Sequence, residues 1–413
     1  MIRLLALTML LWVASGCRAQ VSPPPLESQR SVDVQQPLTH RPVAVPPAVT
    51  GRQPLLWVSL AAHLGARADA APLTLTAASG SLSLEDRSGR RWSAASVQIS
   101  WRSVPLEQPM ALARRVAGPF ASFESAERVA LRWRALGVAA EVAHPADWEV
   151  WAPAGAPAPE GLPVRDWSTR LESSVEPVLQ LPEGGATLQG PLQIDAPGGL
   201  RRGTGVFQGP FRLQRDAYGS WTLVEQVPLE RYLEGVVPHE IGAGSPQAAL
   251  QAQTVLARTW ALANSHRFRI DGYHLCSDTQ CQVYSDPRQA GQAVRQAITA
   301  TQGRLLSWKG KPISAVYHAT NGGVMAAGPE AWAMDAQPYL KAEADGDAGW
   351  QQRHGLPLQQ RSAVAGLLAQ REGAYGSAHP RFRWTRTLTA SGIRQALGAV
   401  SYTHLRAHET EQH

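Results

Sequence analysis

The sequence predicts an α+β fold, with a small N-terminal α+β region followed by a larger mixed α+β domain. Segments in which apolar and polar residues alternate, such as Leu73–Leu84 and Trp221–Val227, predict β-strands. The Ala-rich run from Gln247 to Asn264 contains no helix breaker and predicts a long helix. A stretch rich in Pro, Ala and Gly at 152–163 separates two sets of such patterns. With 413 residues, 44% of them hydrophobic, the chain is long enough for two domains with cores of their own.

Residues 1–17 have the pattern of an export signal. Arg3 supplies a positive charge, Leu4–Val13 is apolar but too short for a lasting membrane span, and small residues lead to Cys17. This pattern resembles a bacterial lipoprotein signal, in which Cys17 becomes the lipidated N-terminus. The alternative is an ordinary secretory peptide with an incidental cysteine, and either way we expect export. Residues 18–54, rich in Pro, Gln, Ser and Val without periodicity, predict a disordered tether.

Residues 55–151 predict the small N-terminal α+β region. A helix is expected from Ser122 to Leu136 with Gly137 as its C-cap, and strands are expected on both sides of it. The pattern G-P-F-x-S-x-x-x-A at the start of this helix resembles part of a sporulation-related (SPOR) repeat, which implies binding to glycan without stem peptides. The alternative is a generic small α+β unit. Residues 152–180 are predicted to form a linker.

The long helix and the elbow before it hold the first candidate site residues. Apolar residues cover most of the helix circumference, which is typical of a buried helix, so its polar residues need partners. We assign two of them, Gln253 and Arg258, to substrate binding, and we expect Ser245 to be the N-cap. Upstream, a strand-like lead at Tyr232–Val237 ends at an apolar elbow that carries Glu240. A carboxylate in such a place has a raised pKa, which a general acid needs.

Four blocks in a fixed order carry a family resemblance. They are E-R-Y-L-E-G-V-V-P-H-E with the helix after it, C-S-D-T-Q-C-Q-V-Y at Cys276–Tyr284, Y-H-A-T-N-G-G at Tyr317–Gly323 and P-Y-L-K-A-E-A-D at Pro338–Asp345. Together they resemble the stage II sporulation protein D/LytB (SpoIID/LytB) family over residues 181–400. The resemblance implies a peptidoglycan lytic transglycosylase, a lyase that cuts denuded glycan strands of the cell wall, with Glu240 as the catalytic glutamate.

The implied reaction needs one carboxylate. Hydrolytic glycosidases commonly use two, whereas here the attacking group is the muramoyl C6 hydroxyl of the substrate. Glu240 would protonate the glycosidic oxygen and then accept the hydroxyl proton, which leaves a 1,6-anhydromuramoyl end. For the other nearby carboxylates, Glu230 and Glu234, we expect a solvated or paired role. The alternative function, on the LytB side of the family, is a non-catalytic peptidoglycan-binding protein or an enhancer of an autolysin (amidase).

The cysteine pair leaves two structural alternatives open. Cys276 and Cys281, with His274 close by, could ligate a structural zinc ion, and in an exported protein they could equally form a disulfide. A structural pair is favoured over a catalytic thiol because no activating group is visible. The predicted chemistry itself requires no cofactor.

The matching blocks also predict substrate-binding residues near the C-terminal half of the site. These are Gln282, Tyr284, His318, Asn321, Gly322 and Gly323. The Q-x-Y pair is expected to line the glycan groove, although a tyrosine packed in the core is the alternative for Tyr284. Paired glycines permit tight backbone geometry and close approach of a ligand. His318 and Asn321 are expected to contact sugar hydroxyls or to orient Glu240.

The charge of the chain fits an acidic partner. The net charge is +6 and the pI about 9.5, which suits anionic lipid, cell-wall polymer or nucleic acid. With the family resemblance, we expect peptidoglycan glycan strands and cell-wall hydrolases as partners, no nucleic acid, and a lipid-anchored position facing the cell wall or periplasm. The tail Ser401–His413 turns polar and His-rich and resembles a read-through artefact. We therefore expect the native C-terminus to be missing, and we do not interpret these histidines as metal ligands.

Overall fold

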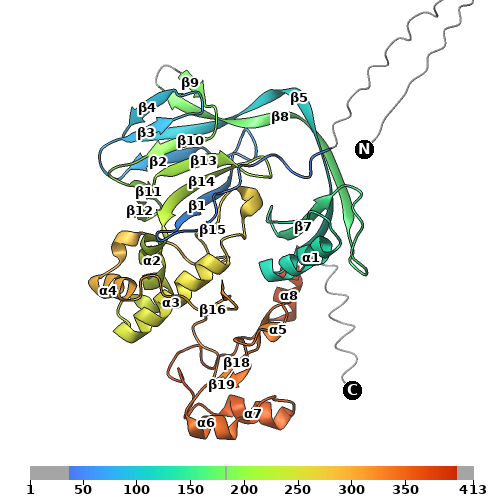
Figure 1. Cartoon of the computed structure of the whole chain (residues 1–413), viewed down its shortest axis with the longest axis vertical. Coiled ribbons are helices and arrows are strands. Elements are labelled where there is room, and N and C mark those ends of the chain that lie inside the picture. The colour runs from blue at the N-terminus through green and yellow to red at the C-terminus, as the bar shows by residue number, and fades with distance from the viewer. Residues whose placement is uncertain (1–36, 182–183, 398–413) are drawn as a thin grey trace, which may run out of the picture. The chain divides into compact units, whose positions relative to one another are not determined.

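The computed structural model describes residues 37–181 and 184–397 (Figure 1). The predicted signal at 1–17 with its Cys17, the first half of the predicted tether and the tail at 401–413 lie outside the described residues. Strands and helices are mixed along the described chain, which confirms the α+β class. Among its helices, none is long and apolar enough to cross a bilayer.

Seven strands form the first sheet. In sheet order they are β15 (Leu275–Cys276), β1 (Leu55–Leu64), β14 (Trp221–Pro228), β13 (Phe211–Arg215), β10 (Leu192–Asp195), β3 (Leu82–Glu85) and β4 (Arg91–Ala94). β1 runs antiparallel to β14 and parallel to β15. The first strand of the chain therefore lies between two strands that come much later in the sequence.

Eight strands form the second sheet. They are β12 (Gly205–Phe207), β11 (Leu200–Arg202), β2 (Leu73–Ala77), β5 (Ser96–Phe120), β7 (Trp148–Pro153) and β6 (Glu141–Ala143), with β8 (Arg165–Leu181) beside β5 and β9 (Gly184–Thr187) beside β8. β5 and β8 pair antiparallel over almost their whole length. Figure 1 shows them as a long ribbon that carries β7 and helix α1 (Phe123–Ala135) at one end.

These pairings correct the predicted division into 55–151, a linker at 152–180 and 181–400. Strands β1 to β3 pair with β14, β11 and β10, so residues of the two predicted domains share both sheets. Most of the predicted linker is strand β8. The described part of the predicted tether is also attached to the second sheet, since Leu38 forms a β-bridge with Leu112. Alternation identifies a strand and its buried face but not the neighbouring strand, and for this reason the sequence suggested two units.

Both sheets and three helices share one core. The helices are α2 (Leu229–Val237), α3 (Gln247–Ala263) and α4 (Gln292–Ala300), which Figure 1 shows grouped near the ends of β1 and β14. The core includes Val58, Leu84 and Ile194 from the first sheet, Leu75, Ile99 and Leu200 from the second, and Leu233, Val236 and Leu250 from the helices. Each such side chain, when fully buried, contributes roughly 1.5–3 kcal/mol to folding.

Helix α1 confirms the helix predicted between Ser122 and Leu136. Ser122 is the N-cap and accepts a hydrogen bond from the backbone N–H of Ser125, and Gly137, just beyond the end, has a φ of 75°. The buried face of α1 packs into a second core cluster with Trp148 of β7. The resemblance of this segment to a SPOR repeat stays a prediction.

Beyond α4 the elements are short. β16 (Ser307–Trp308) pairs with β17 (Lys311–Pro312), β18 (Val324–Met325) pairs with β19 (Glu343–Ala344), and the helices are α5 (Gly328–Ala331), α6 (Ala348–Arg353), α7 (Arg361–Ala369) and α8 (Ala390–Leu397). The fully buried Trp350 packs with Leu367, Ala374 and Phe382 in a small separate core. The C-terminal part thus depends on few apolar contacts around one tryptophan.

Candidate functional site

Glu240 lies on a π-helical turn between α2 and α3. The predicted strand-like lead at Tyr232–Val237 is wrong, because these residues belong to helix α2. Pro238 has no N–H, so the regular i→i−4 hydrogen bonding cannot continue through it, and the chain forms a π-helical turn over Pro238–Gly242. Gly242, with a φ of 87°, ends the turn. Such turns are frequent at functional sites.

Ser245 supports this turn instead of capping α3. Its hydroxyl donates to the carbonyl oxygen of Ile241 at 2.8 Å. Helix α3 begins at Gln247 after Pro246, without a side-chain cap. The predicted N-cap role is therefore wrong, and the serine closes the turn that carries Glu240.

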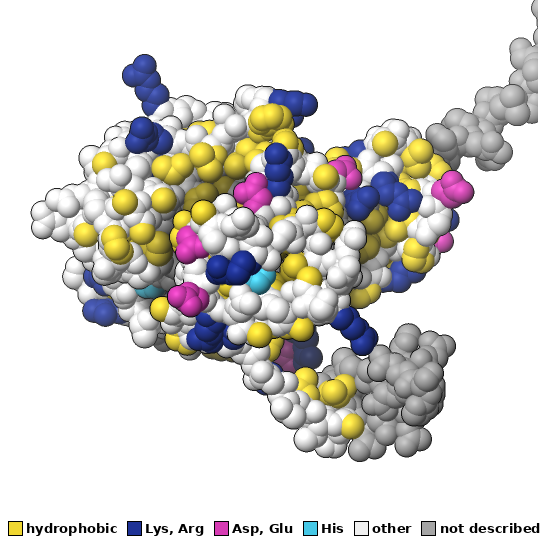
Figure 2. Space-filling model, turned by 90° about the horizontal axis from the view of Figure 1, so that it is seen from below, with side chains coloured by type: hydrophobic (Ala, Val, Ile, Leu, Met, Phe, Trp, Pro, Cys, Tyr) yellow, Lys and Arg dark blue, Asp and Glu magenta, His cyan; other side chains and the backbone are white. Residues whose placement is uncertain are grey.

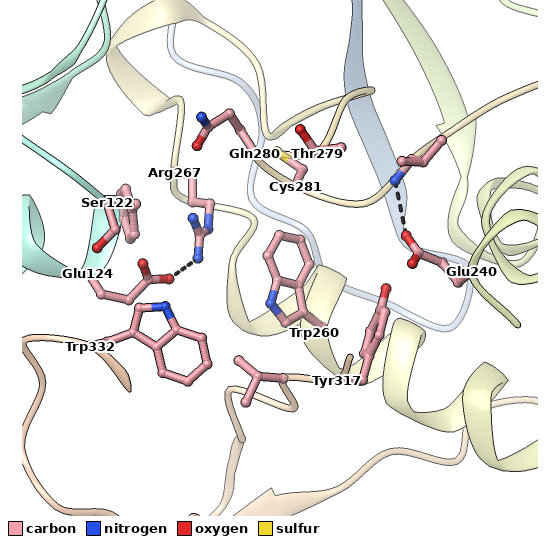
Figure 3. A pocket seen from close by; sticks show the side chains of 13 residues that line it. Ser122, Glu124, Glu240, Trp260, Arg267, Thr279, Gln280, Cys281, Tyr317 and Trp332 are labelled. Carbon is pink, nitrogen blue, oxygen red and sulfur yellow. Dashed lines mark hydrogen bonds and ion pairs between the residues drawn. The ribbon is translucent and has the colours of Figure 1, made fainter. Parts of the chain in front are cut away.

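The Glu240 carboxylate is half-buried and lines a cavity (Figure 3). The backbone N–H of Val283 donates to its Oε1 at 3.1 Å, and the Tyr317 hydroxyl points toward it. Burial raises the pKa of Glu240, while the Val283 N–H, the Tyr317 hydroxyl and His239 favour the charged form and limit the rise. A carboxyl group balanced in this way can donate a proton and then accept one.

The cavity has a volume of about 370 Å³, within the range of roughly 300–1,000 Å³ that is common for ligand sites. Its walls include Ser122, Phe123, Glu124, Trp260, Arg267, Gln280, Tyr317 and Trp332. Figure 3 shows Glu240 and Tyr317 on one side, the ion pair of Glu124 with Arg267 on the other, and Trp260 between them. Aromatic side chains and polar groups thus face the same space as the acid.

Gln282 holds Tyr317 from behind. Gln282 is 1% exposed, its Nε2 donates to the Tyr317 oxygen at 2.8 Å, and its Oε1 accepts from the Tyr232 hydroxyl at 3.1 Å. Because the Tyr317 oxygen accepts from Gln282, its own proton is free to point toward Glu240. Burial also raises the pKa of Tyr317, which keeps it a donor. The prediction that Gln282 lines the cavity is therefore wrong. Gln282 instead orients Tyr317, which does line it.

Cys276 and Cys281 form a disulfide with Cα atoms 5.7 Å apart. His274 is not a third ligand beside them: its Nδ1 accepts from the Trp57 backbone N–H and its Nε2 lies 2.8 Å from the Pro47 carbonyl oxygen. Burial lowers the pKa of His274, so the ring is held neutral with both nitrogens occupied. Among the residues that the structure covers, no three His, Cys, Asp or Glu side chains gather as a metal site would require.

Three other predicted substrate contacts lie in the interior. Arg258 is buried and forms a two-point ion pair with Glu230, with Nη2 to Oε2 at 2.6 Å and Nε to Oε1 at 2.9 Å. The Tyr284 hydroxyl donates to Glu225 at 2.8 Å within the core. Gln253 is also buried, and its Nε2 finds no hydrogen-bond partner in the described ranges. The substrate role predicted for Arg258 and Tyr284 is wrong because their polar groups are occupied, and Gln253 is too deeply buried to reach substrate.

The residues of 318–323 lie away from the Glu240 cavity. Asn321 donates to Asp345 at 2.6 Å and accepts from the Gly323 N–H at 2.8 Å. Gly322 and Gly323 have φ values of 68° and 94°, and the Gly323 carbonyl accepts from the Trp350 indole. His318 is exposed in a neighbouring cavity of about 360 Å³ that shares Trp332 with the first. His318 and Asn321 therefore do not orient Glu240, because Asn321 belongs to the turn over Trp350 and His318 lines the neighbouring cavity. The sugar contacts expected of this segment stay a prediction.

The sequence analysis missed several residues of the cavity. Tyr317 stands at the head of the Y-H-A-T-N-G-G block, and this position could have singled it out. Trp260 lies on the helix that was recognised. Glu124 and Arg267 are far apart in the sequence, and no local pattern signals that they meet.

Two family models match the chain. Residues 217–308 match one described as Stage II sporulation protein (SpoIID), and residues 326–412 match one described as a domain of unknown function. The second range includes most of the tail at 401–413.

Several curated relatives match part of the chain. The chain is 36% identical over 135 residues to Stage II sporulation protein D of Bacillus amyloliquefaciens, covering 29% of this chain and 39% of that protein. It is 36% identical over 113 residues to the Amidase enhancer of Bacillus subtilis, covering 27% of this chain and 15% of that protein. It is 33% identical over 124 residues to an uncharacterized protein of Brachyspira hyodysenteriae, covering 29% of this chain and 32% of that protein. The chain thus spans less than half the length of each, and the segment 217–308, which holds Glu240 and the disulfide, is the part that matches the Stage II sporulation protein model.

Proposed function

We propose that this protein is a peptidoglycan lytic transglycosylase with Glu240 as its single acid/base. The observation that carries the proposal is a half-buried carboxyl group with a raised pKa in a cavity with aromatic walls. The other carboxylate lining this cavity, Glu124, is occupied by its ion pair with Arg267. The similarity to proteins named Stage II sporulation protein D supports a role at the cell wall.

The proposed reaction follows from one carboxyl group. Glu240 donates its proton to the glycosidic oxygen as the bond from that oxygen to the muramoyl C1 breaks. The muramoyl C6 hydroxyl oxygen then bonds to C1, and its proton passes to the Glu240 carboxylate. No water is consumed and the acid is regenerated. The Tyr317 hydroxyl and the Val283 N–H stabilise the carboxylate between the two proton transfers.

The test is product analysis on peptide-free glycan strands. The purified full chain should release fragments that end in 1,6-anhydromuramoyl groups, which mass spectrometry distinguishes from hydrolysis products because they are lighter by one water. Glu240→Gln should lose about 10²–10⁴-fold in rate, the usual contribution of a general acid. Glu234→Gln is the matched control, because Glu234 pairs with Arg231 and does not line the cavity. Products without anhydro ends, or full activity of Glu240→Gln, would contradict the proposal.

A second candidate is a non-catalytic enhancer of a cell-wall amidase. It is supported by the 36% identity over 113 residues to the protein named Amidase enhancer. In this case the chain would bind glycan without cutting it and would raise the rate of an added amidase. The same rate enhancement by Glu240→Gln would favour this function over transglycosylation.

We propose the cell wall, reached by export and anchoring through Cys17, as the place of action. Glycan strands and cell-wall hydrolases are then the proposed partners. The face in Figure 2 carries Lys and Arg side chains interspersed with acidic and hydrophobic ones, whereas nucleic-acid-binding faces concentrate basic residues. Cys17→Ser should move the protein from the membrane to the soluble fraction, and an unchanged distribution would count against lipid anchoring.

A further inference from the structure

A second cavity adjoins the cavity at Glu240 and lies along helix α1. The second cavity has a volume of about 300 Å³ and shares Phe123 and Glu124 with the first. Its other walls come from later residues of α1, from the end of α3 and its C-cap, and from residues between 312 and 337. The two cavities are therefore neighbours, the first at the proposed acid and the second along α1, and together they are called the groove below.

A buried cation fixes α1 as a wall of this groove. The Arg267 side chain is 6% exposed and is ion-paired with Glu124. Its guanidinium carbon lies 4.5 Å from the ring centre of Phe123 and 4.9 Å from that of Trp260. Its Nε donates to Asn264 at 3.0 Å. Because the guanidinium is held on several sides, the start of α1 has a defined position beside the Glu240 cavity.

Farther along α1, the second cavity offers polar side chains in two pairs. Glu127 Oε1 lies 2.7 Å from His266 Nε2, and Arg128 lies 3.7 Å from Asp335 across the groove. Leu131, which is 56% exposed, adds an apolar surface next to them. Paired charges can donate and accept hydrogen bonds to hydroxyl and amide groups, and the apolar surface suits the face of a sugar ring.

We propose that this second cavity is a saccharide subsite that binds sugar residues of the same glycan strand beyond the bond cut at Glu240. The inference rests on the proposed transglycosylase function, since a strand bound at Glu240 is the ligand nearest to the adjoining cavity. A strand that reaches both cavities gains contacts that a short oligosaccharide lacks, so affinity rises with strand length. Helix α1 lies outside the SpoIID match at 217–308, so its part of the subsite lies outside the matched segment.

The experiment compares long and short glycans in the full chain. The test variant Arg128→Ala with Leu131→Ala removes two exposed contacts without disturbing the helix, and Asp335→Ala removes one from the opposite wall. The control, Arg132→Ala with Leu136→Ala, changes the same residue types outside the cavity, one in the last turn of α1 and one at its C-cap. Binding to long peptide-free strands, measured in a Glu240→Gln background, should weaken about tenfold in the test variant. Binding of a disaccharide in the same background should stay unchanged. The kcat for disaccharide cleavage, measured with Glu240 intact, should also stay unchanged.

The outcomes separate this inference from the proposed function. Length-dependent loss in both test variants, but not in the control, supports the subsite. The subsite is overturned if the test variants bind long strands with wild-type affinity, or if they lose as much affinity for the disaccharide as for long strands. It is also overturned if the parent chain binds no glycan. Binding with the expected length dependence but without cleavage would sink the transglycosylase function alone. Cleavage with no length dependence would sink the subsite alone.

Discussion

Two segments that carry equally clear family blocks, 276–284 and 317–323, have different roles in the molecule. The first forms a disulfide, gives Glu240 a backbone N–H from Val283 and holds Tyr317 through Gln282. The second, after Tyr317, turns away and packs on Trp350. Tyr317 lines the Glu240 cavity while the next residue, His318, lines its neighbour. A block shared with a family can therefore contain residues that stabilise the fold as well as residues that serve the reaction.

The largest loss of stability should come from Gly323→Ala, which tests the structural role of the segment 317–323. A Cβ there would lie 2.5 Å from Trp350 Cζ2, in a residue with a φ of 94°. We expect a loss of about 3 kcal/mol in unfolding free energy, from backbone strain plus overpacking. Tryptophan fluorescence during denaturant unfolding measures it.

Gly310→Ala is the control for this substitution. Gly310 has a φ of 76°, but a Cβ there meets no atom within 4 Å. Backbone strain alone should then cost about 1 kcal/mol. Equal losses in the two variants would contradict the role of the Trp350 contact.

Removal of the disulfide should have the next largest effect, on stability and activity together. Cys276→Ala with Cys281→Ala opens a short loop, which the chain-entropy model values at roughly 2 kcal/mol. The same loop leads to Val283, so the hydrogen bond to Glu240 should loosen and activity should fall. Thermal unfolding and glycan cleavage measure the two effects. A reductant should affect the wild-type chain in the same direction and leave the variant unchanged.

Gln282→Leu should lower kcat/KM about tenfold, or about 1.4 kcal/mol, because Tyr317 loses the partner that orients it. Asn321→Ala is the comparison from the second segment. It removes two hydrogen bonds of the turn over Trp350, so stability should fall while kcat/KM per folded molecule stays. A loss of kcat/KM in Asn321→Ala similar to that in Gln282→Leu would undo the distinction between the segments.

The smallest effect should be a shift in pH dependence in Tyr317→Phe, beside a fall in kcat/KM at least as large as that of Gln282→Leu. The Tyr317 hydroxyl lowers the pKa of Glu240 by stabilising its charged form. Without it the pKa rises further, the protonated acid persists to higher pH, and the alkaline limb of kcat/KM should move upward by less than about one unit. His318→Ala should leave this limb in place. A downward shift in Tyr317→Phe would mean that the hydroxyl does not stabilise the carboxylate.

The sequence predicted the parts of the fold that depend on local pattern. Helices α1 and α3 lie close to where residue spacing and breakers placed them. The pairing of β1 with β14 was not predictable in this way, because it joins strands that are far apart in the sequence. For the same reason, a region that resembled a separate domain proved to share both sheets.

The candidate site followed the same rule. Glu240 was identified as a general acid from its place at an apolar elbow and from the family blocks. Its raised pKa and its place in a cavity fit that hypothesis. Arg258 was assigned to substrate because buried polar residues need partners, but the partner is Glu230. The contribution of Glu124 could not be predicted, since its position depends on contacts between α1 and Arg267 that no local pattern records.

The direction in which the Glu240 side chain points depends on the number of residues in the π-helical turn at Pro238–Gly242. In an α-helix each residue advances the direction of a side chain by about 100°. Deleting His239 from the turn would change the direction of the Glu240 side chain by about 100° and rotate it away from its cavity, although every functional side chain would still be present. Insertions and deletions at this elbow are therefore a route by which relatives can keep the fold and the glycan-binding walls while losing the acid.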